Sequence, residues 1–404
     1  MTSTTDVTAM SSAIAKETQA LRDIQGLRLN IASISDIHLN HPNTPTEMII
    51  RNLETYAFPD TPETHKLNII FIGGDVTDSL MDFASGNAIA YRRWVCSFLW
   101  MCAKNDIMVR IIEGTPLHDW KQSNIFIEEN ENNHIGCDVK YFKDIHIETI
   151  DRYGIDVLYI PDEIRPTTQA TWQRVQELLD ERGLTQVDYA VMHGAFSYQL
   201  PDVASLKDKV HDEENYLSIV RHYIFIGHVH QHRPKGKIIP NGSFDRLAHG
   251  EEDIKGHVRL MKGNIEFVPN LGAMRYITLD VAGLPPEEIL AKVDERLTGN
   301  LDKFKVRLRA NRNDAAFGII RRLSEIYPHG IFDVETKDKT RHREERISAR
   351  EFARNGTMAV LTRENLLSEL MRSIDESLRA DGEFDQAQYD ACAKLAENII
   401  RAVK

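Results

Sequence analysis

Histidine and aspartate side chains recur in this sequence directly after short apolar runs. The clearest case is Gly227-His228-Val229-His230, which follows the run Tyr223 to Ile226. That run predicts a buried strand. Two imidazoles one residue apart can both present a nitrogen to an ion such as zinc, iron or manganese. Taken alone, the pair is explained equally well as two histidines of a surface loop.

Upstream segments end in the same way. The predicted strand LRLNIASIS is followed by Asp36 and His38, the run LNIIFI by Asp75, and the strand Val187 to Met192 by His193. Each has a simpler explanation alone, since Asp-x-His is common in turns and Asp75 could cap the helix that follows. Because strand ends meet at one edge of an α/β sheet, we expect one cluster of metal ligands. The candidates are Asp36, His38, Asp75, His193, His228 and His230.

Two carboxylates and four imidazoles are too many ligands for one ion and suit two. A shared carboxylate can bridge ions roughly 3.5–4 Å apart, and such a pair holds a phosphate ester and activates water. His118 follows a further predicted strand, Ile107 to Ile112. We interpret it as the general acid for the leaving oxygen, oriented by Asp119. The alternative is an ordinary loop histidine.

Strands alternate with helices along the chain, which predicts an α/β fold with the site at one sheet edge. We expect helices from about Leu80 to Ala103 and from Thr168 to Arg182, the second ended by Gly183. Beyond Gly242-Ser243 the pattern changes to short strands that we expect to be antiparallel, ending with Arg275 to Val281.

Composition divides the chain into five parts. We expect an N-terminal extension (1–27), an α/β domain (28–280), an α+β cap (281–335), a charged linker (336–361) and a helical hairpin (362–404) that either packs on the main body or binds a partner helix. Within the cap, four basic residues alternate with apolar ones and would share one strand face. They are Lys303, Lys305, Arg307 and Arg309. That face either is simply solvated or contacts a phosphate backbone.

The overall composition excludes several classes of protein. A formal net charge of −12 argues against a protein that coats nucleic acid by bulk charge. The four cysteines form no CxxC pair, which indicates free thiols in a reducing cytoplasm. An apolar run of about 18 residues is absent, and the N-terminus lacks the features of a secretory signal, so we expect no membrane association.

Together these motifs resemble the calcineurin-like metallophosphoesterases. The match comprises Asp36-x-His38, Gly74-Asp75, His118-Asp119, His193 and Gly227-His228-x-His230. The segment Gly242-Ser243-Phe244-Asp245-Arg246, with Glu251-Glu252, is more closely similar to SbcD-type DNA repair nucleases. The resemblance implies a two-sheet β-sandwich flanked by helices, with a small α+β cap and a C-terminal helical hairpin.

The resemblance also implies a function and a ligand arrangement. It implies two Mn²⁺ ions, with Mg²⁺ as a possible substitute. Asp75 would bridge them, with Asp36, His38 and His230 around the first and His193 and His228 around the second. The implied activity is a Mn-dependent DNA exonuclease or endonuclease for recombination and repair in a bacterial or phage-infected cytoplasm. A homodimer would grip DNA, and the C-terminal helices would dock on an SbcC-type, SMC-like ATPase.

One motif departs from the family. Where the family carries Gly-Asn-His-Asp/Glu, with Asn as a metal ligand, this chain has Gly114-Thr115-Pro116-Leu117-His118-Asp119. The Thr115 hydroxyl, a backbone carbonyl and water are the alternatives for the missing ligand. Two other functions also stay open. One is a phosphomonoesterase or cyclic-nucleotide phosphodiesterase of the same fold, and the other is a non-catalytic scaffold that binds DNA or the ATPase.

Overall fold

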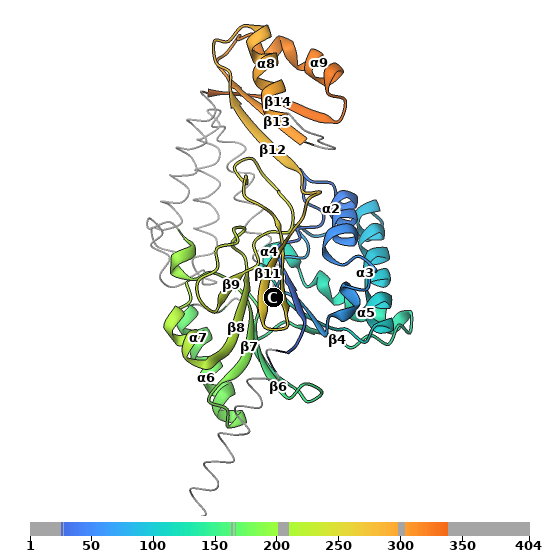
Figure 1. Ribbon diagram of the computed structural model, residues 1–404, viewed down its shortest axis with the longest axis vertical. Coiled ribbons are helices and arrows are strands. Elements are labelled where there is room, and N and C mark those ends of the chain that lie inside the picture. Colours follow the sequence, from blue (N-terminus) through green and yellow to red (C-terminus); the bar gives the residue numbers. More distant parts are fainter. Residues whose placement is uncertain are drawn as a thin grey trace, which may run out of the picture. The chain divides into compact units, whose positions relative to one another are not determined.

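A computed structural model describes residues 28–162, 167–200, 210–297 and 304–337, together with Gly26 and Arg165 (Figure 1). All of them belong to one compact unit that ends at Lys337. Nearly all of the predicted N-terminal extension lies outside the described residues. So do nearly all of the charged linker, the whole helical hairpin and Lys303.

The first sheet has six strands in the order β11-β10-β1-β2-β3-β4. Four of them are parallel: β1 (Ile31–Ile34), β2 (Ile69–Ile72), β3 (Met108–Ile112) and β4 (Val139–Phe142). Two antiparallel strands, β10 (Gly256–Met261) and β11 (Asn264–Pro269), extend the sheet beyond β1. Every residue of β1, β2 and β3 is buried, as expected for strands covered on both faces.

The second sheet has five strands in the order β5-β6-β7-β8-β9. They are β5 (His146–Ile150), β6 (Ile155–Ile160), β7 (Val187–His193), β8 (Val220–Gly227) and β9 (Ile238–Pro240). All neighbours are parallel except the antiparallel pair β5 and β6. The strands that precede His193 and His228 are therefore adjacent and run in the same direction.

The two sheets share one apolar core and carry helices on their other faces. Phe71 of the first sheet packs with Tyr159 and Phe225 of the second in that shared core. The first sheet packs against α2 (Thr46–Asn52), α3 (Gly86–Lys104) and α5 (Ile125–Asn132). The second packs against α6 (Thr168–Arg182) and α7 (Glu213–Ile219) (Figure 1). The predicted α/β class, with parallel-rich sheets flanked by helices, is confirmed at this level.

Helix α3 begins six residues later than the sequence suggested. Ser85 caps it, since its hydroxyl accepts a hydrogen bond from the N–H of Ala88 at 3.2 Å. The segment from Gly73 to Ala84 is therefore a loop between β2 and α3. This loop carries Asp75, so Asp75 is free of the capping role that the sequence left open. Helix α6, in contrast, has the predicted bounds.

A third, small sheet contains β12 (Arg275–Asp280), β13 (Phe304–Ala310) and β14 (Gly330–Thr336). The prediction that residues 275–281 continue the antiparallel strands is wrong, because β12 pairs with β13 in parallel. Helices α8 (Pro286–Arg296) and α9 (Ala316–Ile326) connect the three strands, and crossover helices of this kind produce parallel pairing. The small sheet thus begins upstream of residue 281.

Short turns of helix complete the described chain. They are η1 (Leu53–Ala57), η2 (Thr64–Lys66), α4 (Pro116–Asp119), η3 (Gln122–Asn124) and η4 (Ser197–Gln199). Among the described residues, each helix is too short or too polar to cross a bilayer.

Candidate metal centre

Backbone hydrogen bonds join the loops that carry five of the six predicted ligands, and the sixth, His193, is the last residue of β7. The N–H of Asp36 donates to Gly74 O at 3.0 Å, and the N–H of His38 donates to Asp75 O at 3.0 Å. Across the two sheets, the N–H of His228 donates to both carboxylate oxygens of Asp36, at 3.0 Å each. Loops after β1, β2 and β8 therefore meet at one place, as the positions of the ligands in the sequence predicted.

The six side chains form two groups, each with one potential ligand atom per residue within 4.8 Å of the others. One group is Asp36, His38 and His230, and the other is Asp75, His193 and His228. Asp75 lies between them, because its Oδ2 is 3.4 Å from His193 Nε2 and 3.9 Å from His38 Nε2. The arrangement has the composition of two ion sites with one shared carboxylate.

Hydrogen bonds fix the tautomers of two of the imidazoles. His193 Nδ1 lies 2.8 Å from Gly73 O and must donate to it. In the neutral ring, Nε2 then carries a lone pair directed at the Asp75 carboxylate, so two acceptors face each other. The facing acceptors of His193 and Asp75 require a cation between them, either a proton or a metal ion. A hydrogen bond holds His230 in a similar way, because its Nδ1 lies 2.9 Å from Glu251 Oε1.

Electrostatics at this pair lead to the same conclusion. Burial opposes charge on both groups, yet the Asp75 carboxylate raises the pKa of His193 to about 10. Burial would likewise raise the pKa of Asp75, but His193 and His38 hold it well below its usual range. Without a metal ion, a proton therefore occupies the pair at neutral pH. A divalent cation with imidazole and carboxylate ligands, such as manganese or zinc, would displace that proton.

Four of the ligands have backbone conformations that side chains rarely adopt. The φ angles are 51° at Asp36, 54° at His38, 52° at Asp75 and 95° at His228. The cost is at most about 1–2 kcal/mol per residue, because Asp, Asn and His adopt positive φ more readily than other side chains. Seven other described non-glycine residues share this conformation, so it is not confined to the candidate site.

His118 lies beside the first group, with 37% of its side chain exposed. Its ring meets that of His38 edge to face at a centroid distance of 5.1 Å. Its Nδ1 lies 2.7 Å from the backbone carbonyl oxygen of Asp78 and donates to it, which leaves Nε2 for a substrate. A general acid would need this position at the edge of the site, so the role of His118 stays a prediction.

Asp119 has contacts that differ from those predicted. Its carboxylate accepts hydrogen bonds from the backbone N–H groups of Asp75 (3.0 Å), Thr77 (3.0 Å) and Gly114 (2.7 Å). Burial and the nearby Asp75 raise the pKa of this carboxyl to about 7. Asp119 therefore joins the loops after β2 and β3, whereas His118 is oriented by the Asp78 carbonyl.

Two further groups at the centre, Asp78 and Lys255, were not singled out from the sequence, whereas the Thr115 hydroxyl was one of three alternatives for the missing ligand. Asp78 Oδ1 lies 3.2 Å from His38 Nδ1, and with His118 these residues form a third possible ligand group. Its position three residues after Asp75 was a usable signal. The Thr115 hydroxyl faces Asp75 and His193. Lys255, only 1% exposed, donates to His230 O at 2.9 Å, and nothing in its local sequence indicates that burial.

The basic residues predicted to bind DNA alternate as expected on β13. Lys305 donates to Asn43 O at 2.9 Å, and two arginines pair with acids of β14. These ion pairs are Arg307 with Asp333 at 3.5 Å and Arg309 with Glu335 at 3.2 Å. Their charge is partly neutralised within the cap, which reduces what they can contribute to phosphate binding.

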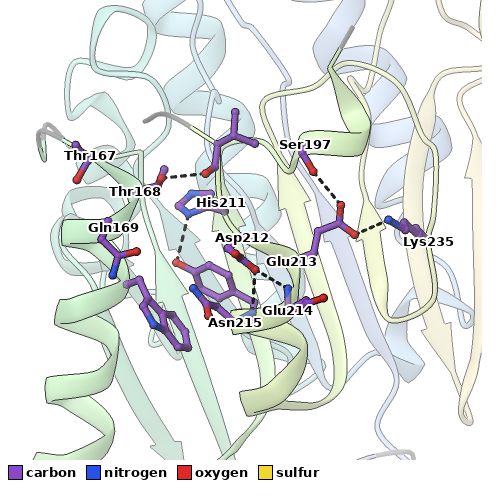
Figure 2. A pocket seen from close by; sticks show the side chains of 13 residues that line it. Thr167, Thr168, Gln169, Ser197, His211, Asp212, Glu213, Glu214, Asn215 and Lys235 are labelled. Carbon is purple, nitrogen blue, oxygen red and sulfur yellow. Dashed lines mark hydrogen bonds and ion pairs between the residues drawn. The ribbon is translucent and has the colours of Figure 1, made fainter. Parts of the chain in front are cut away.

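A separate pocket of about 640 Å³ lies between α6 and α7 (Figure 2). Two of its carboxylates already have partners. Asp212 Oδ1 accepts the N–H of Glu214 at 2.8 Å and caps α7, and Glu213 Oε2 pairs with Lys235 Nζ at 2.6 Å. Among its described lining residues there is none of the six predicted ligands. The two candidate ligand groups are therefore better candidates for a catalytic site than this pocket.

Comparisons with known proteins give little further information. No protein-family model matches the chain, and no protein of curated function matches it by sequence. One crystal structure that it resembles shares 11% sequence identity at a TM-score of 0.34. That match covers 59% of this chain and 98% of the other. A likeness at this level supports no statement about function, so the site has to be interpreted from its own geometry.

Proposed function

We propose that this chain is a manganese-dependent DNA nuclease built on a dimetal phosphodiesterase centre. The observation that carries the proposal is the position of Asp75 Oδ2, 3.4 Å from His193 Nε2 and 3.9 Å from His38 Nε2. A single carboxylate oxygen placed between two ligand sets is the arrangement needed to bridge two ions. The sequence resemblance to calcineurin-like metallophosphoesterases supports the same assignment.

In this proposal each residue has a defined task. Asp36, His38 and His230 would hold one ion and His193 and His228 the other, with Asp75 shared between them. When bound, the ions would polarise the phosphoryl group and lower the pKa of water. His118 would donate a proton from Nε2 to the leaving oxygen while its Nδ1–H stays on the Asp78 carbonyl.

A large substrate is favoured by the openness of the site. His228 is exposed and His118 partly so, which leaves the ligand groups accessible from outside the protein. The choice of DNA follows from the resemblance of residues 242–252 to SbcD-type nucleases. From that resemblance we also propose a cytoplasmic homodimer in recombination and repair. Its partner would be an SbcC-type ATPase bound through residues 362–404, which lie outside the described residues.

The test uses the full chain, first treated with a chelator and then supplied with manganese. Cleavage of an end-labelled linear DNA duplex is compared for wild type, Asp75→Asn and Asp180→Asn. Asp180 is the matched control, because it is exposed on α6 and belongs to neither ligand group. We expect manganese-dependent cleavage by wild type and by Asp180→Asn. Asp75→Asn should be inactive, because an amide cannot bridge two cations with a shared negative charge.

Other outcomes select the alternatives. If intact DNA is recovered while a nitrophenyl phosphomonoester is hydrolysed in a manganese-dependent way, the chain is a phosphomonoesterase. If calorimetry detects no bound manganese, even with DNA present, the chain is a non-catalytic scaffold. Either result would overturn the nuclease proposal.

A further inference from the structure

The Thr115 hydroxyl is directed at the second ligand group, although Thr115 stands where a threonine side chain would usually cap a helix. Thr115 is the N-cap residue of α4, where a threonine usually accepts a hydrogen bond from its own helix. Here the side chain makes no capping bond. Its Oγ1 lies instead 3.2 Å from Asp75 Oδ2 and 3.4 Å from His193 Nε2.

These three atoms are spaced as ligands of one ion. Asp75 Oδ2 and His193 Nε2 are themselves 3.4 Å apart, so all three separations fall between 3.2 and 3.4 Å. Ligands about 2.1 Å from a metal ion lie roughly 3.0 Å apart at right angles and roughly 3.4 Å apart at tetrahedral angles. An ion could therefore contact all three atoms without moving any of them.

The loop that delivers Thr115 is held against Asp75. The Thr115 N–H donates to Asp75 Oδ1 at 2.6 Å, which leaves Oδ2 for the hydroxyl and the imidazole. Gly114 makes this approach possible, because a Cβ there would come within 2.3 Å of Asp75 Oδ1 and 2.1 Å of its backbone nitrogen. The backbone contacts of Thr115 and Gly114 with Asp75 therefore fix the position of the Thr115 hydroxyl.

We propose that the Thr115 hydroxyl is a ligand of the second ion, together with Asp75, His193 and His228, and that the two ions bind with unequal affinity. This inference rests on the dimetal centre proposed above. A neutral hydroxyl oxygen is a weak donor. His228 is exposed, whereas His230, the most exposed residue of the first group, has 31% of its side chain exposed, so water competes more readily with His228 for an ion. The second ion would therefore bind more weakly than the first.

The experiment measures metal binding and does not depend on activity. Manganese is titrated by calorimetry into the chelator-treated full chain, and electron paramagnetic resonance detects the exchange-coupled ion pair. The variants are Thr115→Val, which removes only the hydroxyl from an isosteric side chain, and Thr115→Ser, which keeps it. Thr55→Val is the matched control, because the Thr55 hydroxyl bonds only to the nearby Arg51 carbonyl on an exposed surface.

We expect two unequal binding steps in wild type, Thr115→Ser and Thr55→Val. Thr115→Val should retain the first step and weaken the second by about tenfold or more, with loss of the coupled signal. An unchanged second step in Thr115→Val, or an equal loss in Thr115→Ser, would overturn the role of the hydroxyl. If wild type binds no ion pair, the failure lies in the dimetal centre itself.

Discussion

We expect Glu251 to determine how strongly His230 would bind a metal ion. Its Oε1 lies 2.9 Å from His230 Nδ1, and its Oε2 lies 3.3 Å from the buried Lys255 ammonium. Burial would raise the pKa of Glu251, but the hydrogen bond from His230 and the charge of Lys255 lower it to about 2. An ionised carboxylate therefore accepts the Nδ1–H, which makes His230 Nε2 a stronger donor to the ion.

Replacing Glu251 by Gln tests this effect with little change in shape. Gln can still accept from His230 Nδ1, but without a negative charge. Hydrogen bonds to charged groups contribute about 1.5–3 kcal/mol and neutral ones about 0.5–1.5 kcal/mol. The difference of roughly 1–1.5 kcal/mol corresponds to a Kd for the first ion that is about tenfold higher. Mutating the hydrogen-bond partner of a metal-binding histidine typically lowers metal affinity roughly 10- to 100-fold, and the tenfold estimate lies at the lower end of that range.

The assay is manganese calorimetry on chelator-treated Glu251→Gln and on Glu252→Gln. Glu252 is the neighbouring carboxylate, 60% exposed and 3.6 Å from Arg296, so its loss should leave the Kd unchanged within about twofold. Urea unfolding of both metal-free variants separates loss of stability from loss of affinity. Equal affinity of the two variants for the first ion would refute the reasoning, because the Glu251 charge would then not reach the metal through His230.

Three further predictions follow from other parts of the molecule. His118→Ala should lower DNA cleavage by about 100- to 10,000-fold in gel assays, yet bind manganese normally by calorimetry. Burial, and to a smaller extent the positive charge of Arg259, lowers the pKa of His257 to about 3. His257 therefore stays neutral in the folded protein, whereas in the unfolded chain it takes up a proton below pH 6.5. This histidine should therefore reduce the unfolding free energy by about 2 kcal/mol between pH 6.5 and 5, a loss absent from His257→Gln in urea titrations. Arg110, 1% exposed, joins β3 to Glu148 of β5 at 2.8 Å, so Arg110→Met should destabilise the protein by about 3 kcal/mol in the same titration.

The convergence of the six candidate metal ligands could be predicted because their positions depend on local patterns. Apolar runs such as Ile69–Ile72 and Val187–Met192 form buried strands wherever a core is available. Parallel pairing of β1 with β2, and of β7 with β8, then brings their carboxyl ends to one edge. Residue type and distance from the strand end were sufficient, because the sheet itself supplies the convergence.

The remaining features depend on contacts between distant residues. The Thr115 hydroxyl is positioned by Asp75, 40 residues away. Asp119 could be identified as polar, but its bonds to the N–H groups of Thr77 and Gly114 depend on how two loops pack. The parallel pairing of β12 with β13 follows from the crossover helix between them, which the sequence pattern around residue 275 does not encode. Local propensity carries no signal for any of these contacts.

The facing acceptors at His193 and Asp75 favour a cation site over a scaffold that only binds DNA or an ATPase. The His193 Nδ1–H donates to Gly73 O, so Nε2 and the Asp75 carboxylate face each other at 3.4 Å. Both groups are buried, and two buried acceptors at this distance repel each other unless a proton or a metal ion lies between them. A metal ion that binds the folded state would replace this repulsion with two bonds and would stabilise the fold.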